Sequence, residues 1–258
     1  MSWLKRNEVW IYIIASYLFS VACRLIYVYQ FGDESSFYWN GELMLNTNDG
    51  YFWASGVKNL FDHSLEFNHR VPSLEYGMVT FTYLLAKVLP FSLETITFYE
   101  PVFIASLVVV PIVLVMKLYN KPFLGFLAAL LASVTWSFYN RTMAGYYDSD
   151  LFALLFPVAI VYFLIRTVKE DSLYALLWAM LFIALYFYAY DASKGVIYAM
   201  GIGFIGYLLL FLRGNKRLYD YIFLISVSML DIDWRLRLLL IVVSWILVYR
   251  GFLKAKKT

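Results

Sequence analysis

The chain has 258 residues, of which 62% are hydrophobic, 21% are aromatic and only 15% are charged, and its formal net charge is +3. Its mean hydropathy of +0.68 is far above that of water-soluble domains with ordinary residue usage. These values exclude a soluble globular protein and indicate an integral membrane protein. The apolar runs are continuous rather than alternating, so they predict an all-α, polytopic membrane helical bundle and not a β-barrel.

A spanning helix needs about 20 predominantly apolar residues. On this measure we predict about eight spans within one transmembrane domain covering residues 1–258. The seventh is the weakest, because its length also suits a re-entrant or interfacial segment. The predicted spans are residues 9–29, 97–116, 123–139, 151–165, 173–188, 196–212, 218–230 and 236–252.

The Lys and Arg residues give an orientation, because short cytoplasmic loops are enriched in them. With the N-terminus inside, most of the 21 Lys and Arg residues fall on the cytoplasmic side, with clusters in 117–121, 213–217 and 250–257. We therefore predict that both termini are cytoplasmic and that segments 31–94 and 140–150 face outward.

The first outer loop, residues 31–94, is by far the longest connection and carries two apolar stripes with helical spacing. We expect two amphipathic helices at the membrane surface. The alternative is that the second stripe, which ends before Pro90, is a short extra span. The stripes consist of Trp53, Val57, Leu60 and Phe61, and of Leu74, Met78, Phe81, Leu85 and Val88.

Ionisable groups at membrane depth are costly, about 2.5–3.5 kcal/mol at a helix centre, so each needs a partner or a function. The stretch "NTNDGY" at 46–51 contains Asp49 just before the first amphipathic helix. It could belong to a site, or it could merely cap the helix that begins near Tyr51.

The stretch "NRTMAGYYDSD" at 140–150 places Arg141, Asp148 and Asp150 directly before the fourth span. One interpretation is a helix cap with acidic residues favoured by the helix dipole. Positions i and i+2 lie roughly 200° apart on a helix, so both carboxylates can serve one site only where the backbone is not yet helical. Arg141 could pair with either carboxylate or hold an anionic substrate group.

The remaining ionisable residues near the outer side favour structural roles. For Arg24, inside the first span, a structural partner is the favoured interpretation. Asp191 and Lys194, and likewise Asp231 and Asp233, flank short outer turns and are interpreted as solvated caps.

Asp49, Arg141, Asp148 and Asp150 thus fall on the same side of the membrane in a topology derived without reference to them. Carboxylate oxygens without nearby His or Cys suit Mg²⁺ or Mn²⁺ and not zinc.

Four stretches closely resemble the catalytic subunit of the oligosaccharyltransferases, in particular the single-subunit bacterial type of protein N-glycosylation. They are "TNDGY" at 47–51, "FIASLVVVPIVL" at 103–114, "GFLAALLAS" at 125–133 and "YNRTMAGYYDSD" at 139–150. The resemblance runs over essentially the whole chain, which corresponds to the N-terminal transmembrane part of that family.

The resemblance implies a membrane glycosyltransferase fold, in the bacterial inner membrane, with the site facing the periplasm. It implies that Asp49 and Asp148 bind a divalent metal, that Asp150 supports the metal shell, and that Asp49 and Arg141 take part in catalysis. The implied reaction moves an oligosaccharide from a polyprenyl diphosphate to the Asn amide of an N-x-Ser/Thr sequon. The implied partners are this lipid-linked donor, the acceptor protein and membrane lipid, and no nucleic acid.

The sequence departs from the family beyond the N-terminal membrane part. Later spans, a further Glu ligand and the soluble domain with its W-W-D-Y-G motif have no counterpart in these residues, so a complementary chain could supply them. Two other hypotheses stay open: a glycosyltransferase of another type that uses polyprenyl-phosphate sugars, and a non-enzymatic membrane protein.

Overall fold

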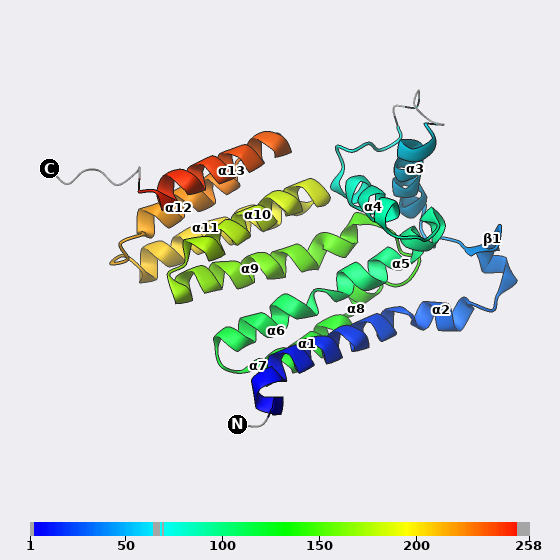
Figure 1. The fold of residues 1–258 in the computed structure, drawn as a ribbon, viewed down its shortest axis with the longest axis horizontal. Helices are drawn as coiled ribbons and strands as arrows, with labels where there is room; N and C mark the ends of the chain where they lie inside the picture. The colour runs from blue at the N-terminus through cyan, green and yellow to red at the C-terminus, as the bar shows by residue number, and fades with distance from the viewer. Residues whose placement is uncertain (1–2, 64–67, 69, 252–258) are drawn as a thin grey trace. The chain divides into compact units, whose positions relative to one another are not determined.

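The computed structural model describes residues 3–63, 68 and 70–251, and the chain divides into two compact units, Met1–Leu155 and Phe156–Thr258. Both units are helical, which confirms the predicted helical membrane fold (Figure 1). The last residue of the eighth predicted span, Phe252, and the C-terminal lysines lie outside the described residues.

The elements of the first unit are α1 (Trp3–Arg24), α2 (Ile26–Phe31), the 3₁₀ turn η1 (Ser35–Phe37), the strands β1 (Tyr38–Trp39) and β2 (Glu42–Leu43), α3 (Asn48–Asp62), α4 (Gly77–Val88), α5 (Leu93–Ser106), α6 (Val109–Leu118), α7 (Pro122–Ser133), α8 (Trp136–Tyr139) and the 3₁₀ turn η2 (Ser149–Leu151). Helix α9 (Phe152–Glu170) continues into the second unit, which contains α10 (Leu173–Ala189), α11 (Ser193–Phe211), α12 (Leu218–Ser228) and α13 (Trp234–Tyr249).

In the first unit, α1, α6 and α7 pack against one another, and α3, α4 and α5 form a second group of mutually contacting helices (Figure 1). The two antiparallel strands pair Tyr38 with Leu43 and Trp39 with Glu42. A small core around Phe98 and Val102 joins α5 to β2 and to Ala144.

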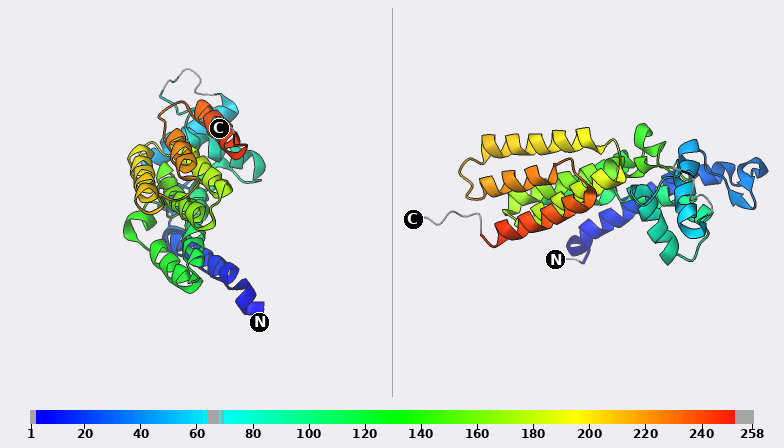
Figure 2. Two further views of the ribbon diagram at one scale, coloured as in Figure 1. Left: turned by 90° about the vertical axis from the view of Figure 1, so that its left-hand side faces the viewer. Right: turned by 90° about the horizontal axis from the view of Figure 1, so that it is seen from above.

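In the second unit, α10, α12 and α13 contact one another and α11 packs against α10 and α12, as the views in Figure 2 also show. A large buried core lies here, around Ile160, Met180, Ile197 and Leu224. Burial of such side chains is worth about 1.5–3 kcal/mol each relative to exposure in water, whereas in lipid their close packing supplies most of the gain.

Two predicted spans contain a break with an identifiable cause. Pro111 has no N–H to donate to the carbonyl of Leu107, four residues earlier, and the junction between α5 and α6 lies at that point. The Leu107 carbonyl instead accepts a bond from Val110 N at 3.0 Å. Between α1 and α2, the Arg24 carbonyl accepts from Ala144 N at 3.2 Å rather than continuing the helical ladder.

By length and composition, four helical segments can cross a membrane: Asn7–Phe31, Leu93–Leu118, Ser149–Glu170 and Ser193–Phe211. They coincide with the first, second, fourth and sixth predicted spans. The other four predicted spans form helices α7, α10, α12 and α13, which have 12, 17, 11 and 16 residues. Helix α10 is at the lower limit of the spanning range of about 17–25 residues, and the other three are shorter. The third predicted span is interrupted between α7 and α8, so the helix ends at Ser133 and not at Tyr139.

The two amphipathic helices predicted in the first outer loop are present as α3 and α4. Trp53, Val57 and Met78 on the predicted stripes are buried, whereas Phe61 and Val88 are exposed. Helix α4 has 12 residues and is therefore about 18 Å long, too short to serve as the alternative extra span.

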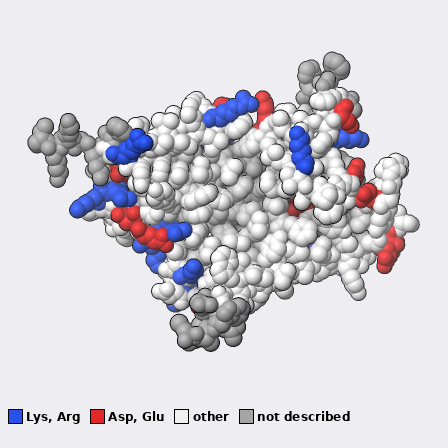
Figure 3. All heavy atoms as spheres, in the orientation of Figure 1, with Lys and Arg blue, Asp and Glu red and all other residues white. Residues whose placement is uncertain are grey.

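Charged side chains gather near the ends of the helices in the face drawn in Figure 3, and the helix sides between them are uncharged. This distribution is typical of helices whose middles lie in hydrocarbon.

Gly125 lets α7 approach α6 closely. A Cβ atom at this position would lie 2.9 Å from Val113 Cα and 2.9 Å from Met116 Cβ, whereas a Cβ at Gly206 on α11 would meet nothing within 4 Å.

We therefore expect Gly125→Ala to lower the free energy of unfolding by about 1–3 kcal/mol through overpacking, which exceeds the ~1 kcal/mol that alanine gains in helix propensity. Thermal unfolding in detergent micelles measures the change. Gly206→Ala is the control and should keep or slightly raise stability; equal effects of the two substitutions would contradict the close packing.

Candidate functional site

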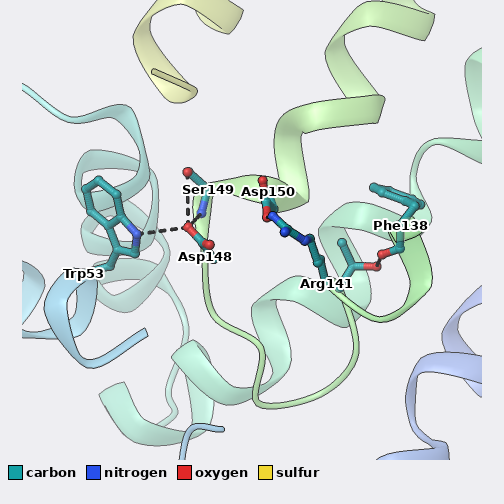
Figure 4. Close-up of polar contacts among 7 residues, drawn as sticks. Trp53, Phe138, Arg141, Asp148, Ser149 and Asp150 are labelled. Atoms are coloured by element: carbon teal, nitrogen blue, oxygen red, sulfur yellow. Dashed lines mark hydrogen bonds and ion pairs between the residues drawn. The ribbon is translucent and has the colours of Figure 1, made fainter. Parts of the chain in front are cut away.

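The predicted site residues on the 140–150 segment stand on irregular backbone, which is the condition for both carboxylates to be available. Asp148 is extended, with φ −154° and ψ 159°, and the 3₁₀ turn η2 starts only after it. As Figure 4 shows, Asp148 lies toward Trp53 of α3 whereas Asp150 lies toward Arg141. The predicted cap is also present, because Asp148 accepts a bond from the Ser149 N–H.

One oxygen of Asp148 carries all of its hydrogen bonds within the described part of the chain. Oδ1 accepts from Ser149 N at 2.6 Å, from Ser149 Oγ at 3.2 Å and from the indole Nε1 of Trp53 at 3.2 Å. No bond to Oδ2 is present among the described residues. Burial, and then the charge of Asp150, raise the pKa of the Asp148 carboxyl above its ordinary value of 3.8. The side chain is therefore fixed in orientation with one oxygen open.

Asp150 pairs with Arg141. Arg141 Nη1 donates to Asp150 Oδ2 at 2.7 Å, and the Asp150 residue is 8% exposed. The Arg141 side chain is 59% exposed, so the guanidinium has further donors facing outward. The bond to Asp150 raises the pKa of the Arg141 guanidinium further above its ordinary range. Asp150 thus holds the Arg141 guanidinium in place.

Asp49 lies in the first turn of α3, and the interpretation that it caps this helix is wrong. Thr47 is the N-cap: its side chain accepts from Gly50 N at 2.9 Å, and the helix begins at Asn48 rather than near Tyr51. Asp49 is exposed, and no hydrogen bond of its carboxylate is present in the described part of the chain. The carboxylate is therefore available for another role.

Gly50 brings the Asp49 turn against the Asp148 segment. A Cβ atom at position 50 would lie 3.1 Å from the backbone carbonyl oxygen of Tyr147, the residue that precedes Asp148. Only glycine permits this approach without displacement of a neighbour. The first turn of α3 and the 147–148 backbone are consequently in direct contact.

The phenol of Tyr146 lies near the charged side chains of the predicted site. Burial raises its pKa, the charge of Arg141 lowers it, and the charges of Asp148, Asp150 and Asp49 raise it. Tyr146 is therefore within electrostatic reach of all four predicted site residues.

Backbone bonds fix the 144–147 segment between α5 and the start of α3. Gly145 N donates to the Phe98 carbonyl at 2.8 Å, and Asn46 N donates to the Gly145 carbonyl at 3.0 Å. Gly145 has φ +80°, a left-handed conformation in which glycine is favoured, and its position against the Phe98 ring leaves no room for a Cβ. The site is thus built on bonded backbone rather than on a free loop.

Of the other ionisable residues, Arg24 and Asp233 have the predicted structural roles, whereas Asp191 does not cap α11, whose N-cap is Ala192 without a side-chain hydrogen bond. Arg24 is fully buried: it donates to Thr142 Oγ1 at 3.0 Å and Ser20 Oγ at 2.6 Å, and it lies over the Phe138 ring. It ties α1 to the start of the 140–150 segment.

At the outer turns of the second unit, Asp233 caps α13 by accepting from Arg235 N at 2.9 Å. Lys194 pairs with Asp231 at 2.8 Å, with both side chains more than half exposed, so this pair adds little stability.

Sequence reasoning missed two kinds of residue. Trp53 was placed on an apolar stripe, yet its indole N–H bonds Asp148; the available signal was that a buried Trp needs an acceptor. Glu100, inside the second predicted span, is 4% exposed and was passed over, although a carboxyl at membrane depth is a reason to look for a function.

The donor set fits a hard divalent cation only in part. Within the described residues no group of three or more His, Cys, Asp or Glu side chains could hold a metal ion. Asp49 and Asp148 supply carboxylate oxygens, the ligand type of Mg²⁺ and Mn²⁺, and both have oxygens without a hydrogen bond from the described residues. The pair can contribute two ligands to a site that needs others.

The arrangement is that of a helical membrane protein with an acidic, arginine-containing site at a helix end. Residues 2–256 match the family model described as "Oligosaccharyl transferase STT3, N-terminal", and the chain belongs to this family. This confirms the resemblance seen in the sequence.

Two curated relatives are undecaprenyl-diphosphooligosaccharide–protein glycotransferases of Campylobacter jejuni, one from strain RM1221 and one from serotype O:2. Each is 36% identical over 242 residues, which cover 91% of this chain and 33% of the relative. The chain therefore spans about a third of the length of these relatives.

Solved structures of the Archaeoglobus fulgidus oligosaccharyltransferase share the fold. The apo form has a TM-score of 0.69 at 14% identity, over 98% of this chain and 35% of that one. The complex of the archaeal AglB enzyme with an inhibitory peptide and a dolichol-phosphate has a TM-score of 0.66 at 13% identity, with the same coverage.

The raised pKa of Asp148 gives a prediction about stability. A carboxyl whose pKa is higher in the folded state destabilises the fold once it ionises, so stability falls as the pH rises from about 3.8 through the raised value. Asp148→Asn keeps an acceptor for Trp53 and removes the charge.

We expect Asp148→Asn to unfold at the same temperature as the wild type or at a higher one at pH 7, with a difference that shrinks as the pH is lowered toward 4. Thermal unfolding in detergent across this pH range measures it. A lower unfolding temperature of the variant at pH 7 would show that ionised Asp148 stabilises the fold.

Proposed function

We propose that this chain forms the membrane-embedded, catalytic N-terminal part of an oligosaccharyltransferase. The reaction moves an oligosaccharide from a polyprenyl diphosphate to the side-chain amide of Asn in an N-x-Ser/Thr sequon. The curated relatives carry the matching name, and the family assignment supports the reaction class.

The single observation that carries the proposal is the contact of Gly50 with the Tyr147 carbonyl. It joins two segments that are far apart in sequence and places their acidic residues, Asp49 and Asp148, at adjoining backbone positions. Both carboxylates have oxygens that accept no hydrogen bond from the described residues. Asp49 is not the helix cap, and the bonds of Asp148 all go to Oδ1.

Asp49 and Asp148 would hold a divalent cation, Mg²⁺ or Mn²⁺, with Asp150 supporting the shell. When bound, the cation supplies a positive charge that offsets the charge developing on the diphosphate leaving group. Residues beyond this part of the protein, or a complementary chain, would complete the ligand set, because the described residues hold no group of three or more such ligands.

The chain's own residues support two further roles. An amide nitrogen is a poor nucleophile because its lone pair is delocalised, and the exposed Asp49 carboxylate can accept its N–H bonds and favour a rotated, more nucleophilic form. Arg141, held by Asp150 and otherwise exposed, can donate to an anionic group of the donor.

The proposed setting rests on the same topology. We place the chain in the bacterial inner membrane with both termini in the cytoplasm and the site on the periplasmic side, where it meets the lipid-linked donor and the acceptor protein. The distribution of Lys and Arg supports this orientation.

Metal binding tests the proposal. We expect the full chain in detergent to bind Mn²⁺, and Asp49→Asn or Asp148→Asn to weaken binding by at least tenfold, because each removes a charged ligand. Mn²⁺ titration followed by electron paramagnetic resonance measures the affinity.

Asp33→Asn is the matched control, since Asp33 is an exposed acid of the same outer loop without a role in the cluster. Equal affinities of the wild type and the two site variants would overturn the proposal. Loss of affinity in Asp33→Asn as well would point to a general charge effect of the outer surface.

A further inference from the structure

Glu100 on α5 is a buried carboxyl group that the proposed reaction does not use. It is 4% exposed, it lies in the membrane-spanning segment Leu93–Leu118, and its Oε1 has no hydrogen-bond partner among the described residues. A half-satisfied polar group in such a place costs stability, so its presence calls for an explanation.

The other oxygen of Glu100, Oε2, accepts a bond in a short hydrogen-bond network. Thr82 Oγ1 of α4 has two acceptors for its one proton, Glu100 Oε2 at 2.8 Å and the Met78 carbonyl at 3.0 Å, of which Glu100 is the shorter and carries charge. The phenol of Tyr147 donates to Thr82 Oγ1 at 2.6 Å. Thr82 and Tyr147 are both fully buried. These hydrogen bonds therefore join α5, α4 and the 140–150 segment through three buried side chains.

Tyr147 connects this network to the site. Its carbonyl oxygen faces Gly50, next to Asp49, and the following residue is Asp148. The Tyr147 ring is thus the anchor of the backbone that carries Asp148, and Thr82 is the one hydrogen-bond partner of its hydroxyl among the described residues.

Burial raises the pKa of the Tyr147 phenol far above its ordinary value of 10.0, and the nearby Glu100 raises it further, so the phenol remains a hydrogen-bond donor at any working pH. The anchor does not release by titration.

We propose that Glu100 is a positioning residue for the metal-binding carboxylates: through Thr82 and Tyr147 it fixes the backbone at Asp148 against the first turn of α3. The expected effect on metal binding rests on the proposed function, whereas the positioning itself rests on the hydrogen bonds. It explains why a carboxyl group that is unfavourable for folding is kept in a spanning helix.

Glu100→Met separates the contribution of Glu100 to folding stability from its contribution to the position of Asp148. Replacing a buried, half-satisfied carboxyl by an apolar side chain of similar shape is near neutral or favourable for folding. If Glu100 positions Asp148, the same variant should lose Mn²⁺ affinity by about 10- to 100-fold, as is common for residues that orient metal ligands.

The experiment compares Glu100→Met, Thr82→Val and Tyr147→Phe with Glu100→Gln, which keeps an acceptor for Thr82. We expect the first three to lose Mn²⁺ affinity, and Glu100→Gln to keep near wild-type affinity. Glu100→Met should lose affinity with little change in unfolding temperature, whereas Thr82→Val also lowers that temperature because it leaves Glu100 and the Tyr147 hydroxyl without this hydrogen-bond partner. Ser106→Ala is the control on the same helix, because buried Ser106 donates only to the Val102 carbonyl of its own helix within the described part of the chain.

Hydrogen–deuterium exchange of the peptide covering residues 145–151 gives a readout that needs no metal. We expect faster exchange in Glu100→Met than in Glu100→Gln, because the Ser149 N–H held by Asp148 is released when the segment moves. Unchanged exchange in Glu100→Met overturns the positioning role, whether or not the protein binds metal.

The two proposals fail in different ways. A wild type that binds no Mn²⁺ but shows the exchange difference contradicts the metal site and leaves the positioning of Asp148 supported. A wild type that binds Mn²⁺ with Asp148-dependent affinity, and a Glu100→Met variant with equal affinity and equal exchange, contradicts the positioning alone.

Discussion

The constraint on which this structure depends is that polar groups at membrane depth must find their partners inside the protein. Arg24 meets it for two of its nitrogens, which donate to Ser20 and Thr142, and its guanidinium lies over the face of Phe138, whereas its Nη2 has no hydrogen-bond partner among the described residues. Its carbonyl leaves the helical ladder to accept from Ala144. The same bonds that satisfy a buried cation thus bind α1 to the segment that begins at residue 140.

That segment is held at further points along its length. Gly145 bonds the Phe98 carbonyl and Asn46, and Tyr147 bonds Thr82, so α5, α4 and the start of α3 each hold it. Such anchoring suits the proposed site, because a catalytic group displaced by even about 1 Å loses much of its efficiency. The exposed carboxylate of Asp49 and the open oxygen of Asp148 are then supported by a rigid, buried framework.

The sequence predicted much of this fold because its signals are local. Continuous apolar runs predicted helices, and helical spacing predicted α3 and α4 within the long loop. It failed at two local details. The third predicted span is broken after Ser133, and Thr47 rather than Asp49 caps α3, since two nearby polar residues compete for one cap and composition does not choose between them.

By itself the sequence determined that this is a helical membrane protein and which family its acidic stretches "TNDGY" and "YYDSD" resemble, and it predicts that both stretches fall on one side of the membrane. Periodicity and charge distribution are properties of short segments and can be read without a structure. Only the tertiary structure decided which oxygen of Asp148 is open, that Asp150 holds Arg141, and that hydrogen bonds join Glu100, Thr82 and Tyr147. Those contacts join residues from separate helices, and their geometry depends on the packing of α3, α4 and α5 and not on any one stretch of sequence.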